Sequence, residues 1–182
     1  MIIKKGTHAP FRLPKLLFNP QALRYEVEFT ESCRYRFGTD DDADVNKLFG
    51  IAFITWGSFW FVIKNLFKGK LKALHHYNSI RWGWRYDALS GRIELLEYSY
   101  SNGYRNIHHY KLLNIGDKVI LSIEGSFDLW EFKFNGISYS YDDPIIGTFH
   151  LTPITWLCYE LHPYFGGNNP APHDMEIKMK RL

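Results

Sequence analysis

The 182-residue sequence contains only two cysteines, no CxxC pair and no cysteine–histidine spacing of the kind that binds zinc. Cys33 and Cys158 each lie in an apolar, strand-like run, so we expect two buried free thiols, with a disulfide as the alternative. The first twenty residues lack the uninterrupted apolar core of a secretory signal, because Pro10 and Pro14 break it. The sequence therefore predicts a protein of the cytoplasm or of a virion.

A strong excess of charge of one sign is also missing. The formal net charge of +3 is too small to indicate a nucleic-acid partner, so we expect none. Aromatic residues are abundant, at 18% of the chain, and tyrosine and phenylalanine favour strands. The length and the 46% of hydrophobic residues suffice for one domain with a sizeable core.

Alternation of apolar and polar residues predicts strands along most of the chain. Leu23 to Phe29 alternate with charged residues, and Cys33, Tyr35 and Phe37 repeat the pattern. Residues 79–113 have the pattern of a three-stranded meander, and three more short strands follow it. Asn102-Gly103 and Asn135-Gly136 supply the positive φ angles of tight hairpins. This even spacing predicts an all-β antiparallel jelly-roll sandwich.

The stretch from Phe49 to Phe67 is the most apolar in the chain and is long enough to cross a bilayer as a helix. Its glycine, serine, lysine and asparagine, and its richness in phenylalanine, tryptophan, isoleucine and valine, favour two buried strands joined by a turn at Gly57-Ser58. An amphipathic helix over residues 59–74 and a transmembrane helix are the alternatives, and we expect no membrane span. This apolar insertion near 52–72 would expose large apolar side chains, which usually mark a partner surface. We therefore predict a partner interface at the following residues: Phe59, Trp60, Phe61 and Phe67.

Five stretches resemble a loose group of jelly-roll proteins from Bacteroidetes genomes and their phages. They are "NKLFG", "HHYNSIRWGWRYD", "GRIELLEYSYSNGYR", "EFKFNG" and, as the most specific, "LHPYFGGNNPAPHDMEI". The group is similar in outline to concanavalin A-like lectins, glucanases and polysaccharide lyases. The resemblance covers about residues 23–182 and implies a concanavalin A-like β-sandwich, which we place at 21–182 behind an extended arm at 1–20.

In such a sandwich the last strand often returns beside the first. We expect Met175, Ile177 and Met179 to face the core in that strand, after a long connection stiffened by Pro170 and Pro172. Tyr164 and Asn168 in this connection serve either the structure or a sugar site. The arm at 1–20 either lies across the domain or reaches a neighbouring chain.

The sequence contains few residues in the arrangements that glycosidases and lyases of this fold need for catalysis. Glu94 and Glu97 are three residues apart and would face opposite sides of a strand, so they do not form a glycosidase pair. Arg105, His108 and Tyr110 form a lyase-like constellation, to which Arg81, Arg85 and Tyr86 could add. We therefore predict that the chain is not an enzyme.

Three weaker ligand sites complete the candidates. Trp82 and Trp84 share one strand face, which is core if it points inward and a glycan platform if it points outward. Asp40, Asp42 and Asp44 resemble the start of a calcium loop, so a structural calcium is possible, although no EF-hand glycine or glutamate follows. We expect no other cofactor.

The arm and the apolar insertion both suggest docking to other protein chains. The leading functional hypothesis is a non-enzymatic structural module, most concretely a phage virion component such as a capsid decoration, head-fibre or tail-associated protein. It would act in a homo-oligomer or a virion. The alternatives are a lectin-like carbohydrate-binding module and, third, a polysaccharide lyase or glycoside hydrolase.

Overall fold

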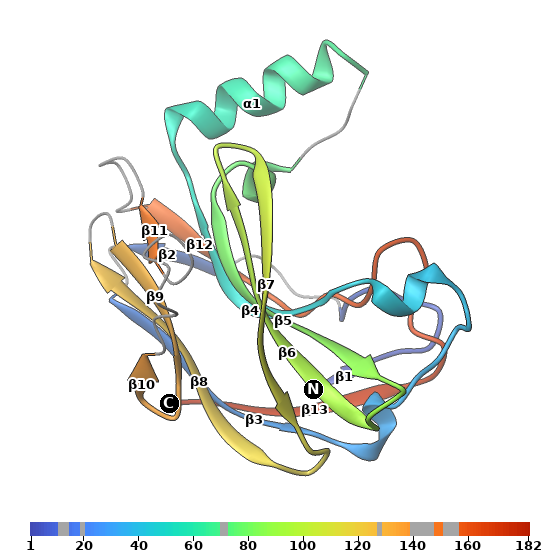
Figure 1. Cartoon of the computed structure of the whole chain (residues 1–182). Helices are drawn as coiled ribbons and strands as arrows, with labels where there is room; N and C mark the ends of the chain where they lie inside the picture. Colours follow the sequence, from blue (N-terminus) through green and yellow to red (C-terminus); the bar gives the residue numbers. More distant parts are fainter. Residues whose placement is uncertain (11–14, 19–20, 70–72, 127–128, 139–147, 151–156) are drawn as a thin grey trace.

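The computed structural model describes residues 1–10, 15–18, 21–69, 73–126, 129–138, 148–150 and 157–182, and its strands form two antiparallel sheets packed face to face (Figure 1). The first sheet has the order β1 (Ile2–Ile3), β13 (Met175–Arg181), β3 (Ala22–Phe29), β8 (Lys118–Ser126), β9 (Leu129–Phe134) and β10 (Ile137–Ser138), and β11 (Thr148–His150) also pairs with β9. The second sheet has the order β2 (Lys15–Phe18), β12 (Leu157–Leu161), β4 (Asn46–Phe53), β5 (Ser79–Asp87), β6 (Arg92–Ser101) and β7 (Tyr104–Leu113). The prediction of an all-β antiparallel sandwich is confirmed.

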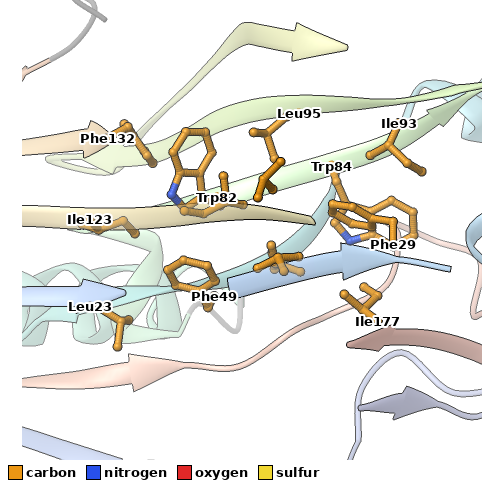
Figure 2. Close-up of a cluster of buried hydrophobic side chains, with 14 of the residues drawn as sticks. Leu23, Phe29, Phe49, Trp82, Trp84, Ile93, Leu95, Ile123, Phe132 and Ile177 are labelled. Carbon is orange, nitrogen blue, oxygen red and sulfur yellow. The ribbon is translucent and has the colours of Figure 1, made fainter. Parts of the chain in front are cut away.

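The core lies between the inner faces of the two sheets and is rich in aromatic side chains (Figure 2). Because side chains alternate along a strand, Trp82 and Trp84 on β5 both point inward, and both are fully buried. Trp82 contacts Phe132 of the opposite sheet edge-on, and Trp84 packs against Phe29. These tilted and edge-on contacts add to the stabilisation from burial alone.

The hairpin turns form where asparagine–glycine pairs predict them. Asn102 and Gly103 have φ angles of 51° and 85° between β6 and β7. Asn135 and Gly136 have φ angles of 50° and 80° between β9 and β10. Asparagine and glycine tolerate this left-handed conformation best, so the local sequence fixes both turns.

The described part of the N-terminal arm lies across the chain's own domain. β1 pairs with β13, and the terminal amino group of Met1 donates to the carbonyl oxygen of Ile177 at 2.7 Å. β2 pairs with β12 at the edge of the second sheet. β13 lies between β1 and β3 with Met175 and Ile177 buried, so the expected return of the last strand beside the first is confirmed.

The expectation of two strands over 49–67 is wrong for its second half. The chain leaves β4 at Phe53 and forms the helix α1 (Trp56–Leu66), so the amphipathic-helix alternative is nearer the structure. Thr55 accepts a hydrogen bond from the backbone N–H of Ser58, while the Ser58 hydroxyl accepts one from the N–H of Thr55. This reciprocal cap begins the helix where we had placed a turn. No helix in the described residues is long and apolar enough to cross a membrane.

Three short 3-10 helices connect the strands: η1 (Glu31–Cys33), η2 (Asp40–Ala43) and η3 (Leu74–His76). The strand expected over Cys33 to Phe37 does not form, because η1 ends there and the chain continues without pairing. Cys33 and Cys158 are both buried free thiols, as predicted, and burial raises the pKa of each to about 12.

Candidate functional site

Basic and tyrosine side chains gather on the outer face of the second sheet, the face turned away from the core. We call the surface formed by Lys47, Arg81, Arg105, Tyr98 and Tyr100 the basic face. Arg81 on β5 lies opposite Tyr98 on β6 and Gly50 on β4 in the strand register. Residues paired in this way share a face, and Arg81 alternates with the inward Trp82. Tyr100 and Arg105 form the next pair along β6 and β7.

Arg81 lies at the centre of this face and is only 6% exposed. Its Nη2 donates to the carbonyl oxygen of His162 at 2.6 Å, whereas its Nε has no hydrogen-bond partner among the described residues. Burial lowers the pKa of the guanidinium to about 10. A Cβ at Gly50 would come within 2.4 Å of the Arg81 Cγ, so the glycine provides the space that this side chain occupies.

Lys47 on β4 lies beside this arginine. Burial, and then the positive charge of Arg81, lowers the pKa of its ammonium group to about 8. Its Nζ lies 5.1 Å from the ring centroid of Tyr98 and 5.8 Å from that of Tyr164. These cation–π contacts hold the amine between two aromatic rings.

Two histidines and further tyrosines surround the cations. The Nδ1 atom of His75 is 3.4 Å from the hydroxyl of Tyr159, and the His76 ring meets Tyr100 edge-on. Burial, then the proximity of His76 and Arg81, lowers the pKa of His75 to about 3. His75 is therefore neutral at physiological pH. Adjacent residues of a strand point to opposite faces, but His75 and His76 lie in the 3-10 helix η3, where their ring centroids are 4.3 Å apart.

The cations at the centre of this face form no direct ion pairs in the described ranges, although the negative charge of Asp44 acts on Lys47. No carboxylate pairs with Lys47, Arg81 or Arg105, and the ion pair of Arg85 with Glu94 lies further along β5 and β6 on the same face. The sequence has no aspartate or glutamate between Asp44 and Asp87. A buried guanidinium and a half-buried ammonium group that form no direct ion pair provide a place for an anionic ligand.

The predicted lyase constellation does not converge. Arg105 lies on the outer face, whereas His108 is paired with Glu97 and Tyr110 packs on Trp82, both on the inner face. Trp82 and Trp84 are core residues, so the glycan-platform alternative is wrong for them. Glu94 and Glu97 face opposite sides, as expected for residues three apart on one strand.

Two other predicted ligand residues lie in the connection before β13. Tyr164 is 37% exposed, stacks on His8 and contacts Lys47, so it borders the basic face. Asn168 is exposed. Whether either residue touches a sugar stays a prediction.

In the predicted calcium loop, Asp42 serves as a hydrogen-bond acceptor within the protein. Asp42 accepts from the backbone N–H groups of Phe37 and Gly38, and it lies in η2 beside Asp40. Across the described residues, no three histidine, cysteine, aspartate or glutamate side chains come together as metal ligands. Asp40, Asp42 and Asp44 therefore do not gather into a cation site.

The predicted interface residues fall on and just after α1. Phe59, Trp60 and Phe67 are exposed, whereas Phe61 packs against Tyr77 and the hairpin turn at Gly103. Sequence reasoning missed Lys47, Tyr98 and Tyr159 entirely. Two features of the sequence could have indicated the basic face. No acidic residue lies between Asp44 and Asp87, and Arg81 alternates with two tryptophans that point into the core.

No protein-family model matches this chain, and neither does any curated protein. Among solved structures, the endo-beta-1,3-glucanase from Pyrococcus furiosus is similar with a TM-score of 0.50 and 11% identity over 91% of this chain and 61% of that one. Alginate lyase AlyC3 is similar with a TM-score of 0.51 and 12% identity over 98% of this chain and 67% of that one, and its complex with dimannuronate gives the same TM-score. The chain spans less than two thirds of the glucanase. At these identities the likeness shows the fold alone: the protein is a jelly-roll β-sandwich.

Proposed function

We propose that the protein is a carbohydrate-binding module that holds an acidic polysaccharide against the outer face of the second sheet. The observation that carries the proposal is Arg81, a buried guanidinium with an unpaired Nε and no carboxylate partner in the described chain. Leaving a charge buried and unpaired destabilises a fold. A carboxylate or sulfate of a sugar bound on this face would supply the missing negative charge.

The neighbours of Arg81 suit the rest of such a ligand. Lys47 and Arg105 add positive charge on the same face, and Tyr98, Tyr100 and Tyr164 add aromatic rings and hydroxyl groups. Aromatic rings pack on the apolar faces of sugars, and hydroxyl groups exchange hydrogen bonds with them. A neutral glucan would leave the cations unpaired, so we expect discrimination by charge.

Binding is favoured over catalysis because the buried histidine and tyrosines of this face, the residue types that act as the base of a lyase, have pKa values shifted away from neutrality. A general base works best when its pKa is near the working pH. The pKa of His75 is lowered to about 3, and burial raises the pKa of Tyr98 and Tyr159, so none of these groups readily accepts or releases a proton near neutrality. A lyase activity would appear as ultraviolet-absorbing unsaturated ends when the protein is incubated with alginate, and we expect none.

The virion role is retained as a separate prediction. A phage structural component, a homo-oligomer and a cytoplasmic or virion location are each compatible with a module that binds surface glycan. These three predictions concern which other chains the protein assembles with, and the basic face does not bear on them. Electron microscopy of purified phage with an antibody against this chain tests them directly.

The binding proposal is tested by titrating the full chain with alginate and with the neutral glucan laminarin in a calorimeter. We expect alginate alone to bind. Arg81→Met should weaken alginate binding at least about tenfold, because one charge-assisted contact is worth about 1.5–3 kcal/mol. It should not lower the melting temperature, since it removes an unpaired buried charge.

The matched control is Arg36→Met, which removes an exposed arginine outside the basic face. It should leave alginate affinity unchanged. Equal binding of alginate and laminarin, or wild-type affinity in Arg81→Met, would contradict the proposal.

The pH dependence of binding offers an independent test. Because the pKa of Lys47 is lowered to about 8, its charge is lost as the pH rises through that value, while Arg81, with a pKa of about 10, stays largely charged. Alginate affinity should therefore fall between about pH 7 and pH 9. Lys47→Gln should bind more weakly at pH 7 and show no further loss over this range.

A further inference from the structure

The helix α1 presents its apolar side to solvent instead of to the protein. Six large apolar residues on this side and at its C-terminal end are exposed: Trp56, Phe59, Trp60, Ile63, Leu66 and Phe67. They recur at spacings of three and four, so they form one stripe along the helix. Phe67 is 89% exposed, and both tryptophans are more than two thirds exposed.

The opposite side of α1 holds the helix on the sandwich. Phe61 packs against Tyr77 and against Gly103 at the tip of the β6–β7 hairpin, and Gly57 lies against the Tyr77 ring. In α1 only Ser58 is fully buried. The apolar stripe is therefore not the side by which α1 packs on the sandwich, because a different side of the helix makes those contacts.

Basic residues border the stripe, and the stretch of sequence that contains α1 has no acidic residue. Lys64 and Lys68 line a groove of about 470 Å³ between α1 and the β6–β7 hairpin, together with Trp60 and Tyr104. The nearest acidic residues in the sequence are Asp44 and Asp87. A helix with an aromatic apolar stripe and flanking lysines has the chemistry that lies in the interface of an anionic bilayer.

We propose that α1 docks the protein onto the surface of an anionic lipid membrane, with its apolar stripe inserted at the headgroup level and Lys64 and Lys68 against the phosphates. α1 lies at one end of the molecule, beyond the tip of the β6–β7 hairpin (Figure 1), so a flat surface can reach the side of the helix that does not pack on the hairpin. A protein partner would more often be met by an apolar surface with mixed charges around it. The lysine border without any carboxylate favours a uniformly negative partner.

The test is co-sedimentation of the full chain with vesicles of phosphatidylcholine alone and of phosphatidylcholine with added phosphatidylglycerol. We expect binding to the anionic vesicles that weakens as salt is added, with a blue shift of the fluorescence of the exposed Trp56 and Trp60. Trp60→Ser with Phe67→Ser should lower the partition coefficient by at least about a hundredfold, because two aromatic rings leave the lipid interface. Lys64→Gln with Lys68→Gln should lower it about tenfold.

Matched controls separate docking from general stickiness. Leu89→Ser removes an equally exposed apolar residue, at 98% exposure, in the β5–β6 turn, and Lys5→Gln with Lys180→Gln removes two exposed lysines elsewhere. Both should sediment as the wild type does. Three results would overturn the proposal: no binding to anionic vesicles, unchanged binding by Trp60→Ser with Phe67→Ser, or a self-associated wild type that these two changes convert to a monomer. Alginate binding by the same variants should be intact, so this test fails or succeeds independently of the carbohydrate proposal.

Discussion

Arg81 is buried on the outer face of the second sheet, although a charged side chain is rarely buried without an ion-paired partner. Its alternation with Trp82 and Trp84 predicts that it points away from a core containing the two tryptophans. Its burial was not predictable, because the residues that cover it come from distant parts of the chain. Tyr98 lies on the neighbouring strand, and the space above Gly50 exists only once β4 and β5 pair.

Glu97 is a buried acid on the inner face, opposite Trp82 in the register. Burial raises its pKa to about 8 from an ordinary value of 4.5. The folded state therefore binds its proton more tightly than the unfolded state does. Its contribution to stability is fully present below about pH 4.5 and is lost as the pH rises toward 8.

Glu97→Gln should accordingly stabilise the protein at alkaline pH. The neutral amide avoids the ionisation that the buried carboxyl resists, so the gain at pH 8 should reach a few kcal/mol and should shrink at pH 5. Urea unfolding at both pH values measures it.

Glu94→Gln is the matched control on the same strand. Although burial raises its pKa, hydrogen bonds from Arg85 and His109 hold the net pKa of Glu94 below its ordinary value. Its stabilisation is present above about pH 4.5, so the glutamine variant should be less stable than the wild type at pH 8. If Glu97→Gln were also less stable than the wild type at pH 8, the raised pKa of Glu97 would be contradicted.

Elements with strong local chemistry were predicted correctly. β5, β6 and β7 follow from alternation and from the Asn102-Gly103 turn, because both signals lie within the segment itself. α1 was missed because an apolar run fits a buried strand as well as a helix. Its start signal, Thr55 with Ser58, differs from the usual capping box, which has glutamate or glutamine at the second position.

Thr55→Ala tests that start signal. Removing the hydroxyl leaves the backbone N–H of Ser58 with the carbonyl oxygen of Thr55 as its acceptor, and loss of the side-chain cap should weaken the helix by about 1 kcal/mol. Since α1 buries little, the loss should stay local. Hydrogen exchange should show faster exchange in residues 56–62, while the melting temperature of the sandwich changes little.

Thr30→Ala is a suitable control, because Thr30 precedes η1 and its hydroxyl donates to the carbonyl oxygen of Glu176 instead of capping a helix. It should leave exchange in α1 unchanged. Unaltered exchange after Thr55→Ala would mean that packing against Tyr77, and not the cap, decides where the helix begins.

At the scale of the whole molecule, the basic face and the apolar stripe of α1 belong to different parts of the chain. The basic face is built on β4, β5 and β6, whereas α1 follows β4 and rests on the far tip of the β6–β7 hairpin (Figure 1). The sandwich could be predicted from strand spacing alone. The combination of two separate surfaces could not, because both depend on how residues distant in sequence are brought together.

The N-terminal arm provides the last prediction, which distinguishes an arm that packs on its own domain from one that packs on a neighbouring chain. Ile3 is fully buried on β1, whereas its neighbour Ile2 is 44% exposed. Ile3→Ala should lower the free energy of unfolding by about 2–4 kcal/mol, and Ile2→Ala by less than about 1 kcal/mol. Urea unfolding measures both, and gel filtration with mass measurement should show the same mass for all three proteins. If Ile3→Ala left stability unchanged but altered that mass, the arm would instead act between chains.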